Sequence, residues 1–419
     1  MIIRWTMVLV LFITAGIGTA TGGRFLGSER AYPDAASRRA AFAQWLVSIE
    51  CRDDTTRGLY PYFRSDDPSF VSSGDDFLSP MVSAKCVMFW LHIGRPDRAF
   101  ETGHRLLAWQ RALSSPTCPR TSGALPSEII RRDGSWHAGT RFYSGDNLVV
   151  LEAFIRLFQQ TGRGEFYEGA LASATWIRDV MCHGENYGVW SEPHGAPMHF
   201  VTAGGAFDNT IYTGVEFMWL YALRHFAEIS GDSSYVDQFN VAKQFLLRGQ
   251  SAYGVWFDRY DPGYPPRPYN PGYWLWYGPR GQYVADNALR AAIGALRAGA
   301  PEQAGRFADA FRIDRGAVPA YYNATTGKPQ FANGDGMYYD VVSSGLWVEL
   351  VTGLERWGDA RGAQRFLVRT QNRNGGWYWG LWRSGLRPVQ RSEAVLTGIW
   401  AVRALERKQQ ARGDERRTQ

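Results

Sequence analysis

The sequence predicts an all-α chain of six consecutive helical hairpins with long loops on one rim. Amphipathic segments alternate along the chain with segments that are apolar on every side. Short connections follow the apolar segments, whereas connections of about 20 to 30 residues follow the amphipathic ones. A short glycine motif also recurs at the start of each long loop. These observations predict one large domain at 24–405, between an N-terminal segment at 1–20 and a charged tail at 406–419.

The two kinds of segment predict two layers of helices. One apolar face and one polar face are typical of an outer helix, and apolar residues on all sides are typical of a buried, inner helix. The predicted outer helices begin near Ala36, Pro96, Glu165, Ser233, Pro301 and Gly358. The predicted inner helices begin with "SPMVSA" at Ser79, "SGDNLV" at Ser144, "FDNTIY" at Phe207, "ADNALR" at Ala285, "YYDVVS" at Tyr338 and "RSEAVL" at Arg391.

The glycine motif consists of glycine, any residue, and an aromatic or aliphatic residue. Its copies start at Gly58, Gly123, Gly188, Gly254, Gly316 and Gly375. Two copies extend to Gln-x3-Gly-x-Trp, at Gln250–Trp256 and Gln371–Trp377. Glycine ends a helix or permits a turn, and the apolar residue tucks an extended segment against the helix ends. The repeat spacing therefore predicts a packing role for this motif.

Composition and the N-terminus bound the class of protein. With 45% hydrophobic and 15% aromatic residues, the chain can bury a large core. The formal net charge is +6, but the basic residues are scattered, which does not favour nucleic acid and leaves an anionic substrate open. The apolar run Met7–Ile17 after Arg4 predicts an export signal cleaved after Ala20, with an uncleaved membrane anchor as the alternative. Either places the domain in the periplasm or outside the cell.

Four cysteines occur in the chain, at Cys51, Cys86, Cys118 and Cys182. In an exported protein they can form disulfides, with three possible pairings if all four join. They lack CxxC spacing and histidine partners, so no zinc site is predicted. We expect no metal and no cofactor.

Six hairpins with long loops on one rim resemble the (α/α)6 toroid of the six-hairpin glycosidase superfamily, over about Ala36 to Leu405. The same toroid also houses polysaccharide lyases and uronyl epimerases and, in related barrels, terpene cyclases and prenyltransferases. The resemblance therefore implies a fold and not one reaction. The Gln-x3-Gly-x-Trp motif is similar to the repeat tag of terpene-cyclase toroids. However, the sequence has neither their aspartate-rich acid motif nor the zinc ligands of a prenyltransferase, so that branch is the less favoured.

In this toroid the long loops and the starts of the inner helices face one funnel, so acids at those starts are the leading catalytic candidates. They are Asp208 and Asp286 first, then Asp146 and Asp340, with Arg391 and Glu393 at the same level of the sixth helix. Each aspartate also has a plainer role as a helix N-cap.

Hydrolysis of a glycosidic bond needs one protonated and one ionised carboxyl group. The helix dipole lowers a carboxylate's pKa, so the aspartates suit the base or nucleophile. The acid is then sought in the loops, at Glu192, Asp258 or Glu128.

A lyase or epimerase would instead use tyrosine, histidine and arginine, because it removes the proton next to a uronate carboxylate and neutralises that charge. This alternative set is Tyr143, Tyr338, Tyr339, His137, His199, Arg141 and Arg391. Rim aromatics suit the C–H face of a sugar ring in either case. The predicted substrate-binding residues are Trp274, Trp276, Trp379, Trp382, Tyr339, Arg391, His137 and His199.

Taken with the resemblance, these residues favour an exported glycoside hydrolase that cleaves a polysaccharide or oligosaccharide with a pair of carboxylates. Two alternatives stay open: a polysaccharide lyase or uronyl C5-epimerase on an acidic glycan, and a non-catalytic toroid that binds glycan or a protein partner. Contact with a membrane is expected only if the N-terminal segment is uncleaved.

Overall fold

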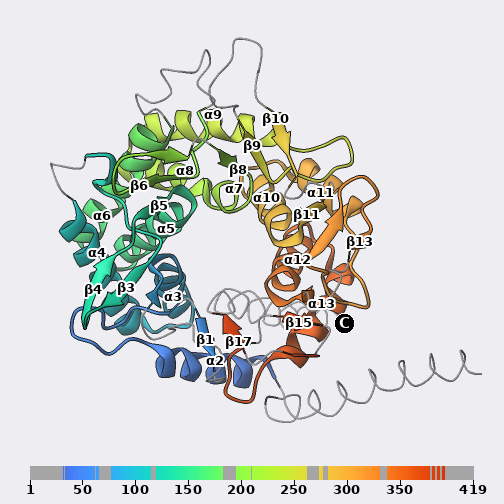
Figure 1. The fold of residues 1–419 in the computed structure, drawn as a ribbon, viewed down its shortest axis with the longest axis horizontal. Helices are drawn as coiled ribbons and strands as arrows, with labels where there is room; N and C mark the ends of the chain where they lie inside the picture. The colour runs from blue at the N-terminus through green and yellow to red at the C-terminus, as the bar shows by residue number, and fades with distance from the viewer. Residues whose placement is uncertain are drawn as a thin grey trace, which may run out of the picture.

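The computed structural model of the chain describes Tyr32 and residues 34–61, 63–65, 77–114, 119–182, 195–208, 210–261, 273–276, 282–330, 337–377, 380–382, 385–386 and 389–391. Within these residues the chain forms a ring of helical hairpins around a central axis (Figure 1). The predicted export segment and the charged tail lie outside them. Among the described residues no helix is long and apolar enough to cross a bilayer.

The predicted alternation of outer and inner helices is confirmed. The outer helices are α2 (Ala35–Ile49), α4 (Pro96–Leu113), α6 (Gly164–Thr175, continued by the π-helical Trp176–Cys182), α9 (Ser234–Leu247), α11 (Pro301–Ala310) and α13 (Trp357–Thr370). The inner helices are α3 (Pro80–His92), α5 (Ser144–Thr161), the pair α7 (Val215–Trp219) and α8 (Tyr221–Ser230), α10 (Ala285–Arg297) and α12 (Val341–Gly353). Most of the sixth predicted inner helix, from residue 392 on, lies outside the described part.

Burial follows the two sequence patterns. In α3 every residue from Pro80 to Trp90 is buried, because the inner helix α5 and the outer helices α2 and α4 pack against it. In α4 the buried residues recur every three or four positions, from Ala99 to Gln110, so that only one face meets the core. Inner helices are thus apolar on all sides, whereas outer helices carry one apolar stripe that faces the core.

One predicted inner helix starts later than the sequence suggested. The segment "FDNTIY" is not its first turn: Phe207–Asp208 form strand β7, and α7 begins at Val215. The cause is local, since the Asp208 carboxylate accepts hydrogen bonds from the backbone N–H and hydroxyl of Thr210. Such an Asx turn competes with helix formation. Asp208 therefore belongs to the rim and not to a helix start.

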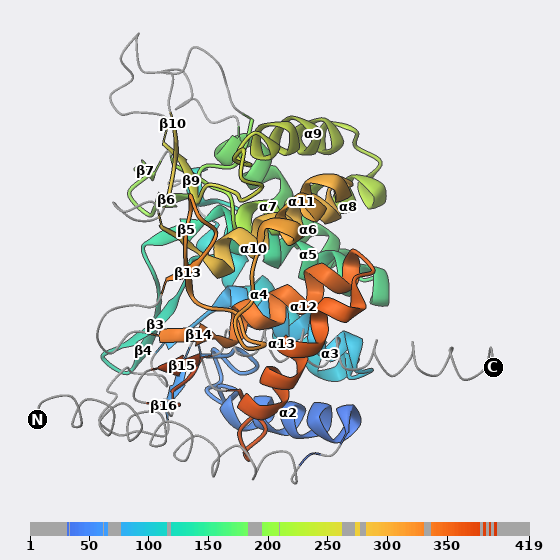
Figure 2. The same cartoon turned by 90° about the vertical axis from the view of Figure 1, so that its right-hand side faces the viewer.

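Short strands, which the helical periodicity did not predict, organise the long loops. They are β1 (Phe63–Ser65), β2 (Phe77–Leu78), β3 (Ile129–Arg132), β4 (Ser135–Ala138), β5 (Arg141–Tyr143), β6 (Phe200–Thr202), β7 (Phe207–Asp208), β8 (Ile211–Tyr212), β9 (Arg259–Asp261), β10 (Tyr273–Leu275), β11 (Gln282–Val284), β12 (Tyr321–Asn323), β13 (Pro329–Gln330), β14 (Met337–Asp340), β15 (Gly380–Trp382), β16 (Gly385–Leu386) and β17 (Val389–Arg391). The strand before each described inner helix pairs with two strands of the next long loop, as β5 does with β6–β7. Figure 2 shows these strands on one side of the ring and the helices on the other.

The glycine motif has the predicted packing role. Its described glycines all have positive φ, at Gly58, Gly123, Gly254, Gly316 and Gly375. At each of them a Cβ would meet the backbone of the following outer helix, or of α2 in the case of Gly375, within about 3.3 Å. In the extended copy at Gln371–Trp377, Gln371 Nε2 donates to Gly375 O and to Arg38 O, and the Trp377 indole donates to Leu367 O. The motif therefore fastens each outer helix to the next.

The last motif closes the ring. Arg38 on α2 donates to Gln371 Oε1 (3.0 Å), and Phe42 packs edge-on against Trp377 with ring centroids 5.2 Å apart. Strand β1 from the first long loop pairs with β17 from the last one. Segments from opposite ends of the described chain are thus neighbours in space, and Figure 1 shows β1 and α2 beside β17.

The described cysteines correct the disulfide expectation. Cys51, Cys86 and Cys182 are free thiols, and Cys118 lies outside the described residues. Cys86 and Cys182 are buried in the helix layers, and this burial raises the pKa of both thiols. These two cysteines act as small apolar core residues.

Candidate active site

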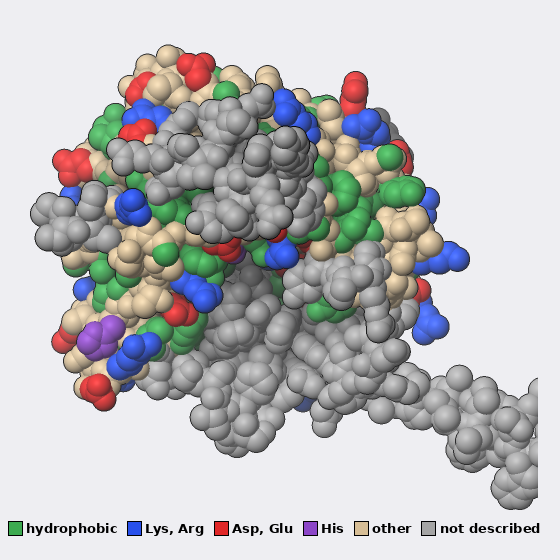
Figure 3. Space-filling view, turned by 45° about the horizontal axis from the view of Figure 1, so that its top comes forward, with side chains coloured by type: hydrophobic (Ala, Val, Ile, Leu, Met, Phe, Trp, Pro, Cys, Tyr) green, Lys and Arg blue, Asp and Glu red, His purple; other side chains and the backbone are tan. Residues whose placement is uncertain are grey.

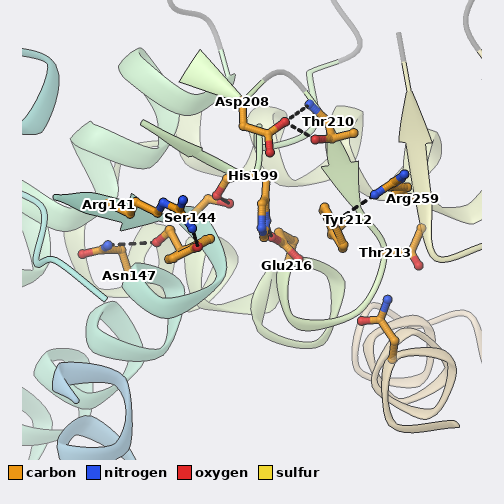
Figure 4. Close-up of polar contacts among 12 residues, drawn as sticks. Arg141, Ser144, Asn147, His199, Asp208, Thr210, Tyr212, Thr213, Glu216 and Arg259 are labelled. Atoms are coloured by element: carbon orange, nitrogen blue, oxygen red, sulfur yellow. Dashed lines mark hydrogen bonds and ion pairs between the residues drawn. The ribbon is translucent and has the colours of Figure 1, made fainter. Parts of the chain in front are cut away.

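The strand-bearing rim is the face where side chains from many hairpins converge. Figure 3 shows acidic and basic side chains side by side at the edge of a hollow in this face. The best-connected cluster lies where the sheets β5–β6–β7 and β8–β9–β10 flank the first turn of α7 (Figure 4).

His199 is the centre of this cluster. Its Nδ1 lies 3.1 Å from Glu216 Oε1, and the two side chains are 22% and 3% exposed. The imidazole stacks on Tyr212, with centroids 4.1 Å apart, and meets the edge of Tyr143 at 4.7 Å. A carboxylate at Nδ1 fixes both the orientation and the tautomer of an imidazole, so the ring is held as an acid–base group would be.

Two arginines lie at the tyrosine hydroxyls. Arg141 is 3.4 Å from the Tyr143 hydroxyl, and Arg259 is 3.2 Å from the Tyr212 hydroxyl. These hydrogen bonds are the largest of several influences that raise the pKa of each guanidinium, and the charge of Asp208 adds to both. Asp208 therefore lies within electrostatic reach of both arginines, above His199 in Figure 4. His199 therefore lies among two arginine–tyrosine pairs and two carboxylates, Glu216 and Asp208.

At this depth α7 carries a glutamate, whereas the other described inner helices carry a serine or an asparagine. In four of them a small polar side chain near the helix start holds the loop segment that follows the glycine motif, at Ser83, Asn147, Asn287 and Ser344. The Asn147 amide, for example, accepts from Leu125 N (2.7 Å) and donates to Leu125 O (2.9 Å). In α7 the side chain in the first turn is a glutamate, and it binds His199. A break in a structural repeat is typical of a functional position.

The predicted helix-start acids have different surroundings. Asp340 is buried as the N-cap of α12, where its carboxylate accepts from Val342 N, Ser343 N and the Ser343 hydroxyl. Asp286 pairs with Arg290 at 3.2 Å and is 27% exposed. Asp146 is half-buried in the first turn of α5, three residues after Tyr143. Capping thus accounts for Asp340, whereas Asp146 and Asp286 stay candidates beside Asp208.

The structure describes two of the three predicted loop acids. Asp258 is buried and accepts from the Asn287 amide at 3.0 Å, so it holds the start of α10. Glu128 is half-buried near Arg141, and its charge helps to raise the pKa of that arginine. Glu192 lies outside the described residues.

The predicted sugar-binding aromatics whose side chains the structure describes are packed against other parts of the protein. Trp274 contacts Phe245 and Tyr260, and Trp276 lies 4.2 Å from Phe257 between ring centroids. Tyr339 donates to Asp314 Oδ2 at 2.5 Å, and burial together with this bond raises the pKa of Tyr339 well above its usual value. A protonated hydroxyl committed to Asp314 is not a base.

The remaining predicted residues are described only in part. His137 is exposed on β4, in the hairpin β3–β4. Trp379 lies outside the described residues, and for Tyr338 on β14, Trp382 on β15 and Arg391 on β17 only the backbone is described. Of the sequence candidates, the structure brings together Arg141, Tyr143, His199 and Asp208.

Three members of the cluster were not predicted from the sequence: Tyr212, Glu216 and Arg259. A signal for the first two is present, because "YSGDN", "YTGVE" and "YVADN" each place a polar residue four positions after a tyrosine, at Asn147, Glu216 and Asn287. Arg259 follows the fourth glycine motif by five positions and carries no such signal.

Comparisons with known proteins bear on the fold. No protein-family model and no curated protein matches the sequence. An α-amylase from Clostridium perfringens aligns with a TM-score of 0.62 at 9% identity, over 88% of this chain and 97% of that one. Cellobiose 2-epimerase from Bacillus thermoamylovorans aligns with a TM-score of 0.64 at 9% identity, over 89% and 99%. An unsaturated glucuronyl hydrolase specific for heparin aligns with a TM-score of 0.60 at 9% identity, over 90% and 98%. These likenesses show the fold of this chain, which is the six-hairpin (α/α)6 toroid.

Proposed function

We propose that this chain is a carbohydrate-active enzyme that moves a proton to and from a sugar carbon, as an epimerase or a lyase does. The observation that carries the proposal is the His199 imidazole, held at Nδ1 by Glu216 and flanked by two tyrosines. The sequence favoured a hydrolase with two carboxylates, and this cluster instead matches the tyrosine, histidine and arginine set of the alternative. The fold is also that of a cellobiose 2-epimerase, among other enzymes named for sugars.

His199 is the proposed base. Glu216 accepts the Nδ1 proton, so the neutral ring keeps its lone pair on Nε2. Because Glu216 occupies Nδ1, we assign Nε2 to the substrate. Nε2 takes the proton from a carbon next to a carbonyl or carboxylate, and the C–H electron pair moves into that group as an enolate.

The tyrosines and arginines complete the reaction. A hydroxyl of Tyr143 or Tyr212 returns a proton to the other face of the carbon, which inverts it, and His199 later passes its proton back to the phenolate. If the enolate instead expels the substituent on the next carbon, that hydroxyl protonates the leaving oxygen and the product is unsaturated. Arg141 and Arg259 hydrogen-bond to the two hydroxyls and stabilise the negative charge that develops there.

Exchange of a carbon-bound proton with solvent tests this proposal. Neutral and uronate-containing oligosaccharides are incubated with the protein in D₂O, and carbon-bound deuterium and ultraviolet absorbance are measured. We expect His199→Gln to reduce turnover by about 10² to 10⁴-fold, the usual contribution of a general base. Glu216→Gln should reduce it less, because the ring remains. The control His104→Gln, on the outer helix α4, should keep full activity.

A glycoside hydrolase is the second candidate, favoured by the carboxylates at the funnel end of the ring. Asp146 and Asp286 lie in the first turns of α5 and α10, and Asp208 lies on β7 between the two arginines. Two of these carboxyls would share the acid and base roles. A hydrolase would release new reducing ends without placing deuterium on carbon. If that activity is lost in Asp208→Asn or Asp286→Asn and kept in His199→Gln, the proton-transfer proposal is overturned in favour of the hydrolase.

A further inference from the structure

The third inner helix is divided, unlike the other described inner helices. Its first part, α7, has five residues from Val215 to Trp219, and α8 resumes at Tyr221. Around Leu220 the backbone hydrogen bonds change from the i→i−4 pattern of an α-helix to i→i−3. Leu220 N donates to Phe217 O, and Leu223 N donates to Leu220 O. The helices α3, α5, α10 and α12 are continuous over 13 to 18 residues. The short piece α7 is the element that carries Glu216.

One side chain from the neighbouring helix α10 touches both sides of this division. Arg297 Nη1 donates to Met218 O at 3.2 Å, and its guanidinium lies 5.1 Å from the ring centroids of both Trp219 and Tyr221. Its Nη2 pairs with Glu349 of α12 at 2.6 Å, with both side chains about one-fifth exposed. A guanidinium presents its donors in a fixed fork, so these contacts define one position for the backbone at the break.

Backbone packing holds the same two helices together closer to the rim. A Cβ on Gly294 of α10 would lie 2.6 Å from Phe217 C and O, and a Cβ on Gly214 would lie 1.6 Å from Asn287 Oδ1. Helix α10 therefore contacts α7 above Glu216, at Gly214, and below it, at Phe217 and Met218. Since α7 is little more than one turn long, its own hydrogen bonds contribute little to its position.

We infer that Arg297 is a positioning residue, which holds α7 at its break so that Glu216 meets Nδ1 of His199. It lies at the far end of α10 and does not touch the proposed reacting atoms. The effect of Arg297 on turnover rests on the proposed function, in which His199 is the base. The hydrogen bond between Glu216 and His199 Nδ1, however, can be measured without turnover.

The test substitutes Arg297→Met, which keeps the length of the side chain and removes its donors and charge. The matched control is Arg224→Met on α8, where an exposed arginine packs on Phe239 and pairs with Glu228, away from the break. The proton on His199 Nδ1 is observed by NMR with ¹⁵N-labelled histidine, and it is assigned by its loss in His199→Gln. We expect this hydrogen-bonded signal to be lost in folded Arg297→Met and to be kept in Arg224→Met.

Turnover gives the second readout. We expect kcat of Arg297→Met to fall about 10 to 10²-fold with little change in KM, because a small misplacement of a catalytic group costs that much. If Arg297→Met does not fold, Glu349→Gln replaces it, and a weaker form of both effects is expected. An unchanged Nδ1 signal in a folded variant overturns the inference. Full activity of His199→Gln overturns the proposed function instead, while the NMR result still decides the role of Arg297.

Discussion

At the scale of single residues, the same amino acid type serves different purposes at equivalent places in the ring. Asp340 and Asp286 both lie at starts of inner helices, but Asp340 caps backbone N–H groups and Asp286 faces Arg290. Sequence position alone cannot separate these roles, because aspartate is both a favoured N-cap and a common catalytic acid. The partners of the carboxylate oxygens decide between them.

The capping role of Asp340 predicts a stability effect without a catalytic one. Asp340→Ala removes the acceptor for Val342 N, Ser343 N and the Ser343 hydroxyl at a buried helix start. We expect the free energy of unfolding to fall by about 1 to 2 kcal/mol, the usual cost of losing an N-cap. Urea titration followed by circular dichroism measures this change. Folded Asp340→Ala should turn over substrate at the wild-type rate, and a large loss of kcat would restore Asp340 as a catalytic candidate.

At the scale of elements, the glycine motif shows what could be predicted from the sequence. The repeat spacing alone indicated a packing role, and the positive φ values and the approach to the next outer helix confirm it. The starts of the outer helices were also predicted within one residue. The start of α7 was not, because a turn around Asp208 resembles a capped helix start in sequence.

A pair of glycine substitutions separates backbone strain from contact. Gly375 and Gly94 both have positive φ, at 96° and 73°, but a Cβ would lie 2.1 Å from Ala41 O at Gly375 and would meet nothing at Gly94. Both alanine variants lose about 1 kcal/mol from the left-handed backbone. We expect Gly375→Ala to lose a further ~1 to 3 kcal/mol from the clash. Equal unfolding midpoints for the two variants in chemical denaturation would contradict this role of the motif.

At the scale of the whole molecule, buried charge on the inner layer links hairpins at the end away from the rim. Glu152 of α5 has no exposed side-chain surface and lies 2.6 Å from Arg156 and 2.9 Å from His225 of α8. Burial alone would raise the pKa of Glu152, but the hydrogen bond from His225 and the charge of Arg156 outweigh it and lower that pKa below 4.5. The folded protein therefore favours the ionised carboxylate.

This lowered pKa makes stability depend on pH in a defined direction. A carboxyl whose pKa is lower in the folded state stabilises the fold above its unfolded pKa, and that contribution is lost as pH falls through the folded value. We expect the melting temperature to fall below about pH 4.5, and to fall less steeply in Glu152→Gln. The exposed Glu228→Gln, 63% accessible in the wild type, is the control and should keep the wild-type slope. Identical slopes in all three proteins would contradict the assignment.

How much of the molecule was predictable follows from the range of the interactions. Helix order depends on local periodicity, so the ring of outer and inner helices was visible in the sequence. The cluster around His199 depends on contacts between different loops and helices, such as Tyr212 with Arg259. Of this cluster only Arg141, Tyr143, His199 and Asp208 were named from the sequence. A single sequence contains no record of which loops meet.

The closure of the ring has a consequence for the order in which the molecule is made. Arg38 and Gln371 are 333 positions apart, so α2 leaves the ribosome long before the segment that covers it exists. Until then the growing chain is an open arc whose first helix has one face uncovered. Joining such distant segments is entropically costly, so we expect closure to be a late step in folding. A circular permutant with new ends at the turn around Gly231 and a linker between the old ends would make this contact local, and it should complete its ring sooner.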